Sequence, residues 1–176
     1  MQYFITIKKH FSVLFALTFA LLSTTPLLAA EKTQYSLSHI STNITVDGVL
    51  DEPHWQNATL VPIAFQDEPN EKGIPPVKTD AYMYEDGSNL YVAFVAEDPQ
   101  PSQITASLRD RDTLWQDDTV ILIIDTFNDE RSAYEFYVNP LGAQGDTRMS
   151  DTDGWQSDRS WDAIWDSAGK ITEQGF

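Results

Sequence analysis

Short segments of alternating apolar and polar residues recur along most of the chain, and turn residues separate them. The expected strands are residues 44–48, 60–65, 79–86, 89–98, 120–124, 132–140 and 143–149. Gly87 and Ser88 lie between two of these segments and predict an antiparallel hairpin. A brief helix capped by Asp51 is expected over residues 52–58, with Pro53 in its first turn. Because no segment has the 3.6-residue period of a long helix, the pattern predicts an all-β, two-sheet antiparallel sandwich of jelly-roll type.

A second hairpin is expected around the turn at Pro140–Gly142. Its first strand, residues 132–140, alternates regularly. The alternation assigns Tyr134, Phe136 and Val138 to the core, and Glu135, Tyr137 and Asn139 to the solvent.

Residues 120–124, Val-Ile-Leu-Ile-Ile, break the alternation because every position is apolar. Ile121 and Ile123 face away from the other three residues, and burying each is worth roughly 1.5–3 kcal/mol relative to exposure. We therefore expect a central strand that is covered on both faces. The opposite sheet covers one face, and a loop, the short helix or a further domain covers the other.

The first thirty residues contain no acidic residue and are typical of a secretory signal. Lys8 and Lys9 precede the apolar run from Phe11 to Leu22, and small residues end at Ala30. The apolar run is shorter than the ~20 residues that span a bilayer. The predicted organisation is a signal peptide at 1–30, a lead-in at 31–43 and one domain at 44–176, in an exported protein of the periplasm, outer membrane or extracellular space.

The domain after the leader is strongly acidic. All 27 Asp and Glu lie there, and removal of the two leader lysines changes the formal charge from −16 to −18. Such a surface repels nucleic acid, so no nucleic-acid partner is expected; it is compatible with a neutral ligand or calcium, and also with simple solubility. The chain has no cysteine, which excludes disulfides and thiolate sites. Only His39 and His54 follow the leader, which disfavours a histidine zinc site and a Ser-His-Asp triad.

Four motifs occur in order along the chain: VDGVLDEPHW, LYVAFVAED, WQDDTVILIIDTF and YEFYVNPLG. Together they resemble the family 9 carbohydrate-binding modules, and most of all those at the N-terminus of larger Gram-negative envelope proteins. The resemblance runs from about Ile44 to the C-terminus and implies a sandwich of about ten strands, often with structural calcium, that binds the ends of sugar chains between two tryptophans. The final AGKITEQGF predicts the turn and start of one more hairpin. We therefore expect a fragment whose last strands, and a further domain, are missing.

The resemblance assigns one sugar-stacking tryptophan to this chain. Trp115, Asp118 and Val120 match its W-x-x-D-x-V motif, and Asn139 matches a polar position. The second tryptophan of the family falls beyond the last residue. Where sugar-binding members have a Glu and an Arg, this chain has Ile121 and Tyr137, which removes two groups that bond hydroxyls.

The other tryptophans have two interpretations each. Trp155 lies in a Gly- and Asp-rich loop and is a candidate for a substitute second platform. Trp161 and Trp165 recur with period two, and we favour core packing over a stacking surface, as for Trp55 on the short helix. Trp115 is either a ligand platform or a cap over the end of the strand.

The charged candidates are equally open. Arg109 either neutralises its acidic neighbours or reaches a ligand hydroxyl near Trp115. Asp125 and Asp98 lie at predicted strand ends, where carboxylates could hold calcium; solvated loop acids are the alternative.

The sequence selects no pair of carboxylates for glycoside hydrolysis. Asp117 and Asp118 are adjacent and would point to opposite faces of a strand. We therefore expect a non-catalytic carbohydrate-binding module, with any hydrolase activity in an attached domain or partner. A structural or interaction domain that has lost sugar binding is the alternative.

Overall fold

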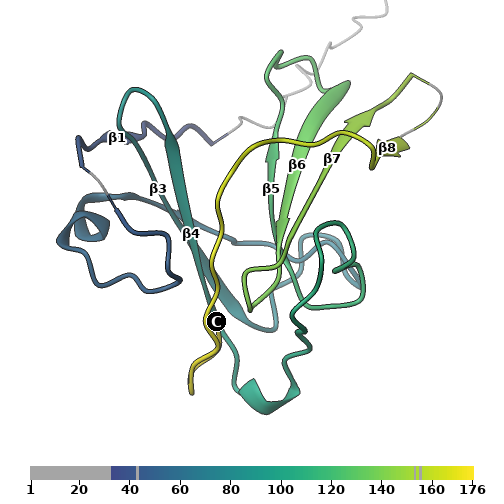
Figure 1. Cartoon of the computed structure of the whole chain (residues 1–176). Helices are drawn as coiled ribbons and strands as arrows, with labels where there is room; N and C mark the ends of the chain where they lie inside the picture. The colour runs from purple at the N-terminus through teal and green to yellow at the C-terminus, as the bar shows by residue number, and fades with distance from the viewer. Residues whose placement is uncertain (1–32, 43, 153, 155) are drawn as a thin grey trace, which may run out of the picture. The chain divides into compact units, whose positions relative to one another are not determined.

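The computed structural model describes residues 33–176 except 43, 153 and 155, so the predicted leader lies outside the described residues (Figure 1). The strands are β1 (Ser38–His39), β2 (Thr59–Pro62), β3 (Lys78–Glu85), β4 (Leu90–Glu97), β5 (Val120–Ile124), β6 (Ser132–Val138), β7 (Gln144–Ser150) and β8 (Gln156–Asp158). Two 3-10 helices, η1 (Pro53–Asn57) and η2 (Pro101–Gln103), complete the regular structure of the described residues. The strands form two sheets, which confirms the predicted all-β, two-sheet fold.

The first sheet is built around the β3–β4 hairpin. β4 pairs with β3 over its full length, and β2 and β1 pair with β3 along its other edge. The turn is held by Asp86, whose carboxylate accepts hydrogen bonds from the backbone N–H of Ser88 and Asn89, while Gly87 adopts a φ of +90°. The predicted hairpin is confirmed.

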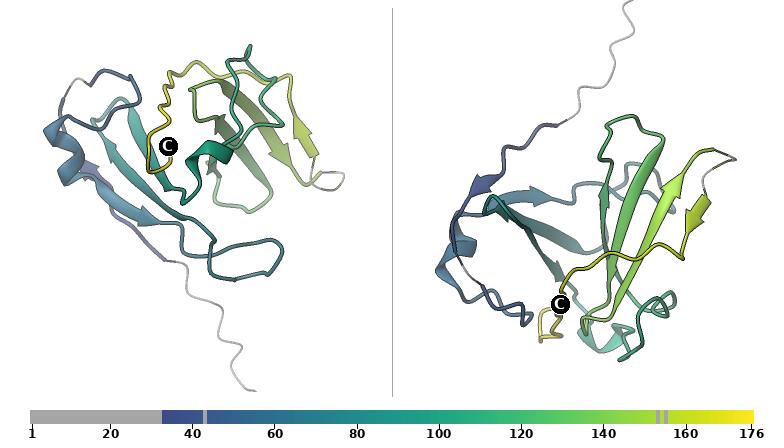
Figure 2. Two further views of the ribbon diagram at one scale, coloured as in Figure 1. Left: turned by 90° about the horizontal axis from the view of Figure 1, so that it is seen from below. Right: turned by 45° about the horizontal axis from the view of Figure 1, so that its top comes forward.

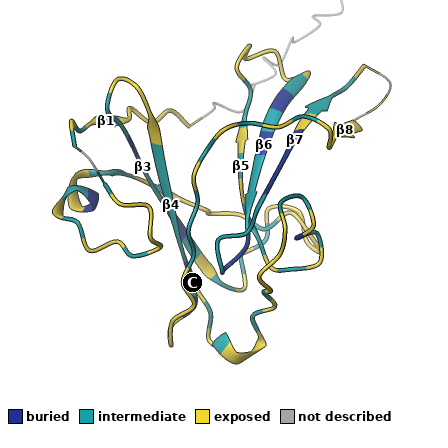
Figure 3. Ribbon diagram, in the orientation of Figure 1, coloured by how far each residue is buried: buried dark blue, intermediate teal, exposed yellow. Residues whose placement is uncertain are grey.

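An aromatic cluster packs on this sheet. Tyr84 is fully buried, stacks on Tyr91 with ring centroids 4.7 Å apart, and meets Trp55 edge-to-face at 5.1 Å. The predicted burial of Trp55 on the short helix is confirmed (Figure 3). The residue that caps this helix is Glu52, one position later than expected.

The second sheet has the order β5-β6-β7-β8, with all its pairs antiparallel. The β6–β7 turn begins at Asn139, whose side-chain oxygen accepts the N–H groups of Leu141 and Ala143. Gly142 completes the turn with a φ of +84°. The predicted second hairpin is confirmed.

Three expectations from the sequence are wrong. β5 lies at the edge of its sheet and is not a central strand, and Ile121 and Ile123 are 41% and 54% exposed. Residues 44–48 form no strand, because Asp47 turns the chain by accepting the N–H of Val49. The outward assignment is wrong for both Glu135 and Asn139, which are buried. Glu135 accepts a hydrogen bond from the Thr147 hydroxyl on the neighbouring strand, and Asn139 Nδ2 donates to Asp117 and to the Ser107 carbonyl.

The segment after β8 crosses the second sheet and then reaches the first (Figures 1 and 2). Trp161 packs on Tyr134 at 4.6 Å, and both Trp161 and Trp165 contact Phe136. The two tryptophans therefore pack against the sheet, but each is half-buried and not part of the fully buried core. At its end, Phe176 exchanges two backbone hydrogen bonds with Ala96 of β4. This segment therefore covers one face of the second sheet and links the two sheets.

Candidate ligand-binding site

Trp115 lies in the loop between η2 and β5 and is half-buried against the second sheet. Its ring meets Tyr137 of β6 edge-to-face at 5.2 Å, and its Nε1–H donates to the carbonyl of Asp112 at 2.6 Å. Gly145 of β7 makes room for the loop, because a Cβ there would come within 2.6 Å of Leu114 Cδ2 and 3.3 Å of Trp115 Cη2. The ring is thus held at a fixed place on the sheet.

The two faces of the second sheet differ in what lies over them. Ile121 is directly opposite Tyr137 in the strand register, and Ile123 is opposite Glu135, so these residues share the face that Trp115 contacts. We call this the open face, since both isoleucines are exposed. The other face, which carries Phe136 beneath the C-terminal segment, is the covered face.

A guanidinium group lies over the Trp115 ring. The Cζ atom of Arg159, directly after β8, is 4.4 Å from the ring centroid, within the range of a cation–π contact. Arg159 itself is exposed. Nothing in the sequence predicted this contact, because Arg159 is far from Trp115 along the chain.

Arg109 and Asn139, two of the predicted site residues, are brought together by Asp117. Arg109 Nε donates to both carboxylate oxygens of Asp117, at 3.0 and 3.1 Å, and Asn139 Nδ2 donates to one of them at 2.8 Å. The hydrogen bond from Arg109, together with those from Asn139 and the Ser107 N–H, lowers the pKa of Asp117 against the opposing effect of desolvation. This network ties the Trp115 loop to the β6–β7 turn.

The amide of Asn139 has partners at both ends. Its nitrogen donates to the Ser107 carbonyl as well as to Asp117, and its oxygen accepts two backbone N–H groups of its own turn. The side chain is buried. In this arrangement Asn139 positions the loop rather than presenting free hydrogen-bonding groups to a ligand.

Asp118 and Trp155 complete the predicted ligand-binding set. The Asp118 carboxylate accepts the Thr105 N–H at 2.8 Å, and the Asp118 N–H donates to the Thr105 carbonyl at the same distance. Trp155 is outside the described residues. Of the predicted ligand-binding residues, Trp115 is the aromatic one that the structure describes, and its ring lies at the open face.

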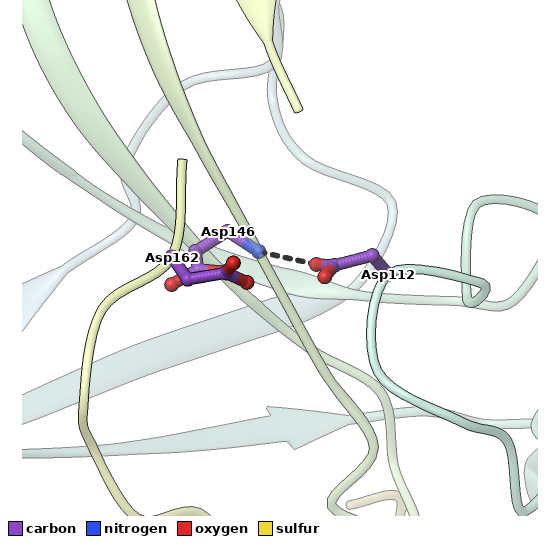
Figure 4. Close-up of side chains that lie close together, drawn as sticks. All are labelled: Asp112, Asp146 and Asp162. Carbon is purple, nitrogen blue, oxygen red and sulfur yellow. Dashed lines mark hydrogen bonds between the residues drawn. The ribbon is translucent and has the colours of Figure 1, made fainter. Parts of the chain in front are cut away.

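An acid cluster, Asp112, Asp146 and Asp162, lies near the start of this loop (Figure 4). One carboxylate oxygen from each lies within 4.8 Å of the others. The guanidinium of Arg111 lies among them: Nη2 is 2.5 Å from Asp146 Oδ2, and Nε is 3.8 Å from Asp112 and 3.6 Å from Asp162. The cluster already holds a cation that belongs to the chain itself.

The same cluster can be tested for the calcium that the resemblance implies. Its donor atoms are of the right type, but Arg111 occupies the space between them. Two atoms of this cluster, Arg111 Nε and Asp146 Oδ1, are buried without a hydrogen-bond partner among the described residues. One is a donor and needs an acceptor, which a metal ion cannot be. The acid cluster therefore does not fit calcium.

Asp125 and Asp98, the predicted metal ligands, each organise a turn. Asp125 accepts the N–H groups of Phe127 at 3.0 Å and Glu130 at 2.8 Å, and such backbone hydrogen bonds, with Glu130 as the largest cause, lower its pKa. Asp98 accepts the Gln100 N–H at 2.7 Å. In the described part of the chain neither belongs to a group of three possible metal ligands. Their role in binding calcium stays a prediction.

Comparison with protein-family models, with curated proteins and with solved structures gives no match for this chain. Within the described residues, no helix is both long and apolar enough to cross a membrane. The geometry of the open face is therefore the main structural guide to function.

Proposed function

We propose that this chain is an exported, non-catalytic carbohydrate-binding module that binds an oligo- or polysaccharide and supports an attached or partner glycoside hydrolase. The observation that carries the proposal is Trp115, held against Tyr137 and Gly145 on the open face. A pyranose ring has an apolar C–H face that stacks on an aromatic plane. The ordered motifs of the family 9 modules, of which Trp115 is part, support the same assignment.

The acids around Trp115 favour binding over catalysis. Asp117 is paired with Arg109, and Asp112 and Asp146 surround Arg111. A general acid for glycoside hydrolysis needs a raised pKa, whereas the pKa of Asp117 is lowered. We therefore assign catalysis to another domain or protein.

Calorimetric titration with xylo- and cello-oligosaccharides tests the proposal. We expect saturable heat for at least one series, abolished by Trp115→Ala because the stacking surface is removed. Phe127→Ala, which truncates another exposed aromatic residue, is the matched control and should bind as the unmodified protein does. If no sugar of either series binds the unmodified protein, the proposal is wrong.

A second candidate function, an interaction domain of a larger envelope protein, is favoured by β5. Its outer edge has no partner strand among the described residues, and Ile121 and Ile123 are exposed beside it. Such an edge is a template for pairing with another chain. Under this alternative the isolated domain self-associates and becomes monomeric with its C-terminal partner domain. A monomeric, well-folded isolated domain in sedimentation velocity would exclude it.

A further inference from the structure

The contact between Arg159 and Trp115 bears directly on how a ligand reaches the ring. The guanidinium carbon lies 4.4 Å from the ring centroid, over one face of the ring. A stacked pyranose needs van der Waals contact with a face of the ring. Arg159 and a sugar therefore cannot occupy this face of the ring together.

Arg159 differs from the other described arginines in what holds it. Arg109, Arg111, Arg131 and Arg148 each lie within 4 Å of a carboxylate. The ion pairs among the described residues do not include Arg159, and its side chain is exposed. Its contact is with the aromatic ring, and an exposed cation–π contact is weak enough for a ligand to displace.

We propose that Arg159 is an intrinsic cover of the Trp115 platform, which a neutral saccharide displaces when it binds. This inference rests on the proposed function and adds a residue that sets the affinity of the site. The saccharide is expected to be neutral because the domain has a formal charge of −18 once the two leader lysines are removed from the total of −16, which repels anionic sugars. While Arg159 lies over the ring, a saccharide cannot stack on Trp115. The apparent affinity for the saccharide is therefore lowered according to the fraction of molecules in which Arg159 covers the ring.

The affinity of Arg159→Ala for the same oligosaccharides tests the cover. Removing a cation–π contact of this exposure should raise the affinity about twofold to fivefold. Arg148→Ala is the matched control: it removes the same charge from the same hairpin, but Arg148 is paired with Asp158 and is expected to leave the affinity unchanged. An unchanged or lower affinity of Arg159→Ala would overturn the inference, because Arg159 would then be a bystander or a direct ligand contact.

The outcomes separate this inference from the proposed function. Binding by the unmodified protein without a gain in Arg159→Ala leaves the module assignment intact and removes the cover. Binding by Arg159→Ala alone would contradict both ideas, because no saccharide then displaces Arg159 in the unmodified protein. If neither protein binds any sugar, both ideas fail, because an uncovered ring has then produced no site.

Proton NMR provides a readout that does not depend on affinity. The side-chain protons of Arg159 should be shifted upfield by the Trp115 ring current, and Trp115→Ala should abolish that shift. Saturation with a binding oligosaccharide should also abolish it. A ring-current shift that persists in the saturated complex, or that is absent from the free protein, would overturn the cover.

Discussion

The two faces of the second sheet carry tryptophans in different settings. On the covered face, Trp161 and Trp165, which belong to the C-terminal segment, pack on Phe136. On the open face, Trp115 is held from below by Tyr137 and Gly145, and above it is one exposed arginine side chain. The tryptophans of the covered face are part of the packing between the sheet and the C-terminal segment, whereas Trp115 is the ring on which we propose that a ligand stacks.

Asp146 is the residue that fastens the covered face. Its Oδ2 atom accepts hydrogen bonds from Arg111, from the Ala163 N–H and from Trp165 Nε1, so one buried carboxylate joins the loop, β7 and the C-terminal segment. Because these three hydrogen bonds share one acceptor, we expect the loss of Asp146 to lower stability more than any other substitution considered below.

Asp146→Ala should lower the free energy of unfolding by about 3 kcal/mol, because the Arg111 guanidinium and two other donors lose their acceptor. Urea denaturation measures this change. Asp166→Ala, which removes an exposed acid from the same C-terminal segment, is the control and should change stability by less than about 0.5 kcal/mol. Equal losses in the two variants would contradict the role of Asp146.

The second test compares alanine substitutions of one tryptophan from each face, Trp161 and Trp115. Trp161→Ala should cost about 2 kcal/mol of stability, since a half-buried indole is lost from its contacts with Tyr134 and Phe136. Trp115→Ala should cost about 1 kcal/mol and abolish sugar binding. Thermal and urea unfolding give the stabilities, and calorimetry gives the binding. If Trp161→Ala lost binding while remaining folded, the two faces would not be divided as we infer.

Acidification should loosen the Trp115 loop. The pKa of Asp117 is lowered in the folded protein, chiefly by Arg109, so its stabilising effect is present above the unfolded-state pKa of about 3.9. That contribution is lost as the pH falls through the folded-state pKa. Asp117→Asn should therefore flatten part of the decline in stability at low pH. Asp125 keeps its own lowered pKa and leaves some decline in the variant. An unchanged slope would show that Asp117 is not stabilised by its partners.

The smallest effect is expected at the exposed isoleucines. Ile121→Thr combined with Ile123→Thr should change stability by no more than about 0.5 kcal/mol per site, because both side chains are already exposed and threonine retains the β-branch. Leu122→Thr, on the covered face of the same strand, should cost more and is the comparison within β5. Urea denaturation of the isolated domain decides between these outcomes. A large loss at the isoleucines would indicate that they are buried in solution, as the interaction-domain alternative requires.

The sequence pattern predicted the two hairpins because the geometry of each turn depends on residues that are adjacent in the sequence. Gly87 with Asp86, and Gly142 with Asn139, fix turns over a few residues, and the flanking alternation then fixes the strand faces. The same logic failed for residues 44–48, where the Asp47 side chain competes for the backbone. Pattern also could not show which segment covers a strand. The apolar run at 120–124 indicates that its side chains favour burial, yet β5 lies at a sheet edge.

The candidate site was predictable only in part. Trp115 and the neighbouring Asp118 follow from a motif within one loop, and Arg109 and Asn139 proved to be neighbours through Asp117. Arg159 reaches Trp115 only because the β6–β7 and β7–β8 pairings return the chain to the same face. Contacts between distant segments of this kind depend on strand register, which sequence spacing does not reveal.

We propose that the open face binds sugar through Trp115 and that the covered face does not. Each of the five tryptophans contributes one indole N–H signal to a ¹H–¹⁵N spectrum, and single substitutions assign these signals. Titration with the oligosaccharide that binds best should shift the Trp115 signal strongly and leave those of Trp161 and Trp165 in place. No shift of the Trp115 signal at a saturating concentration, or a shift confined to Trp161 and Trp165, would contradict sugar binding at the open face.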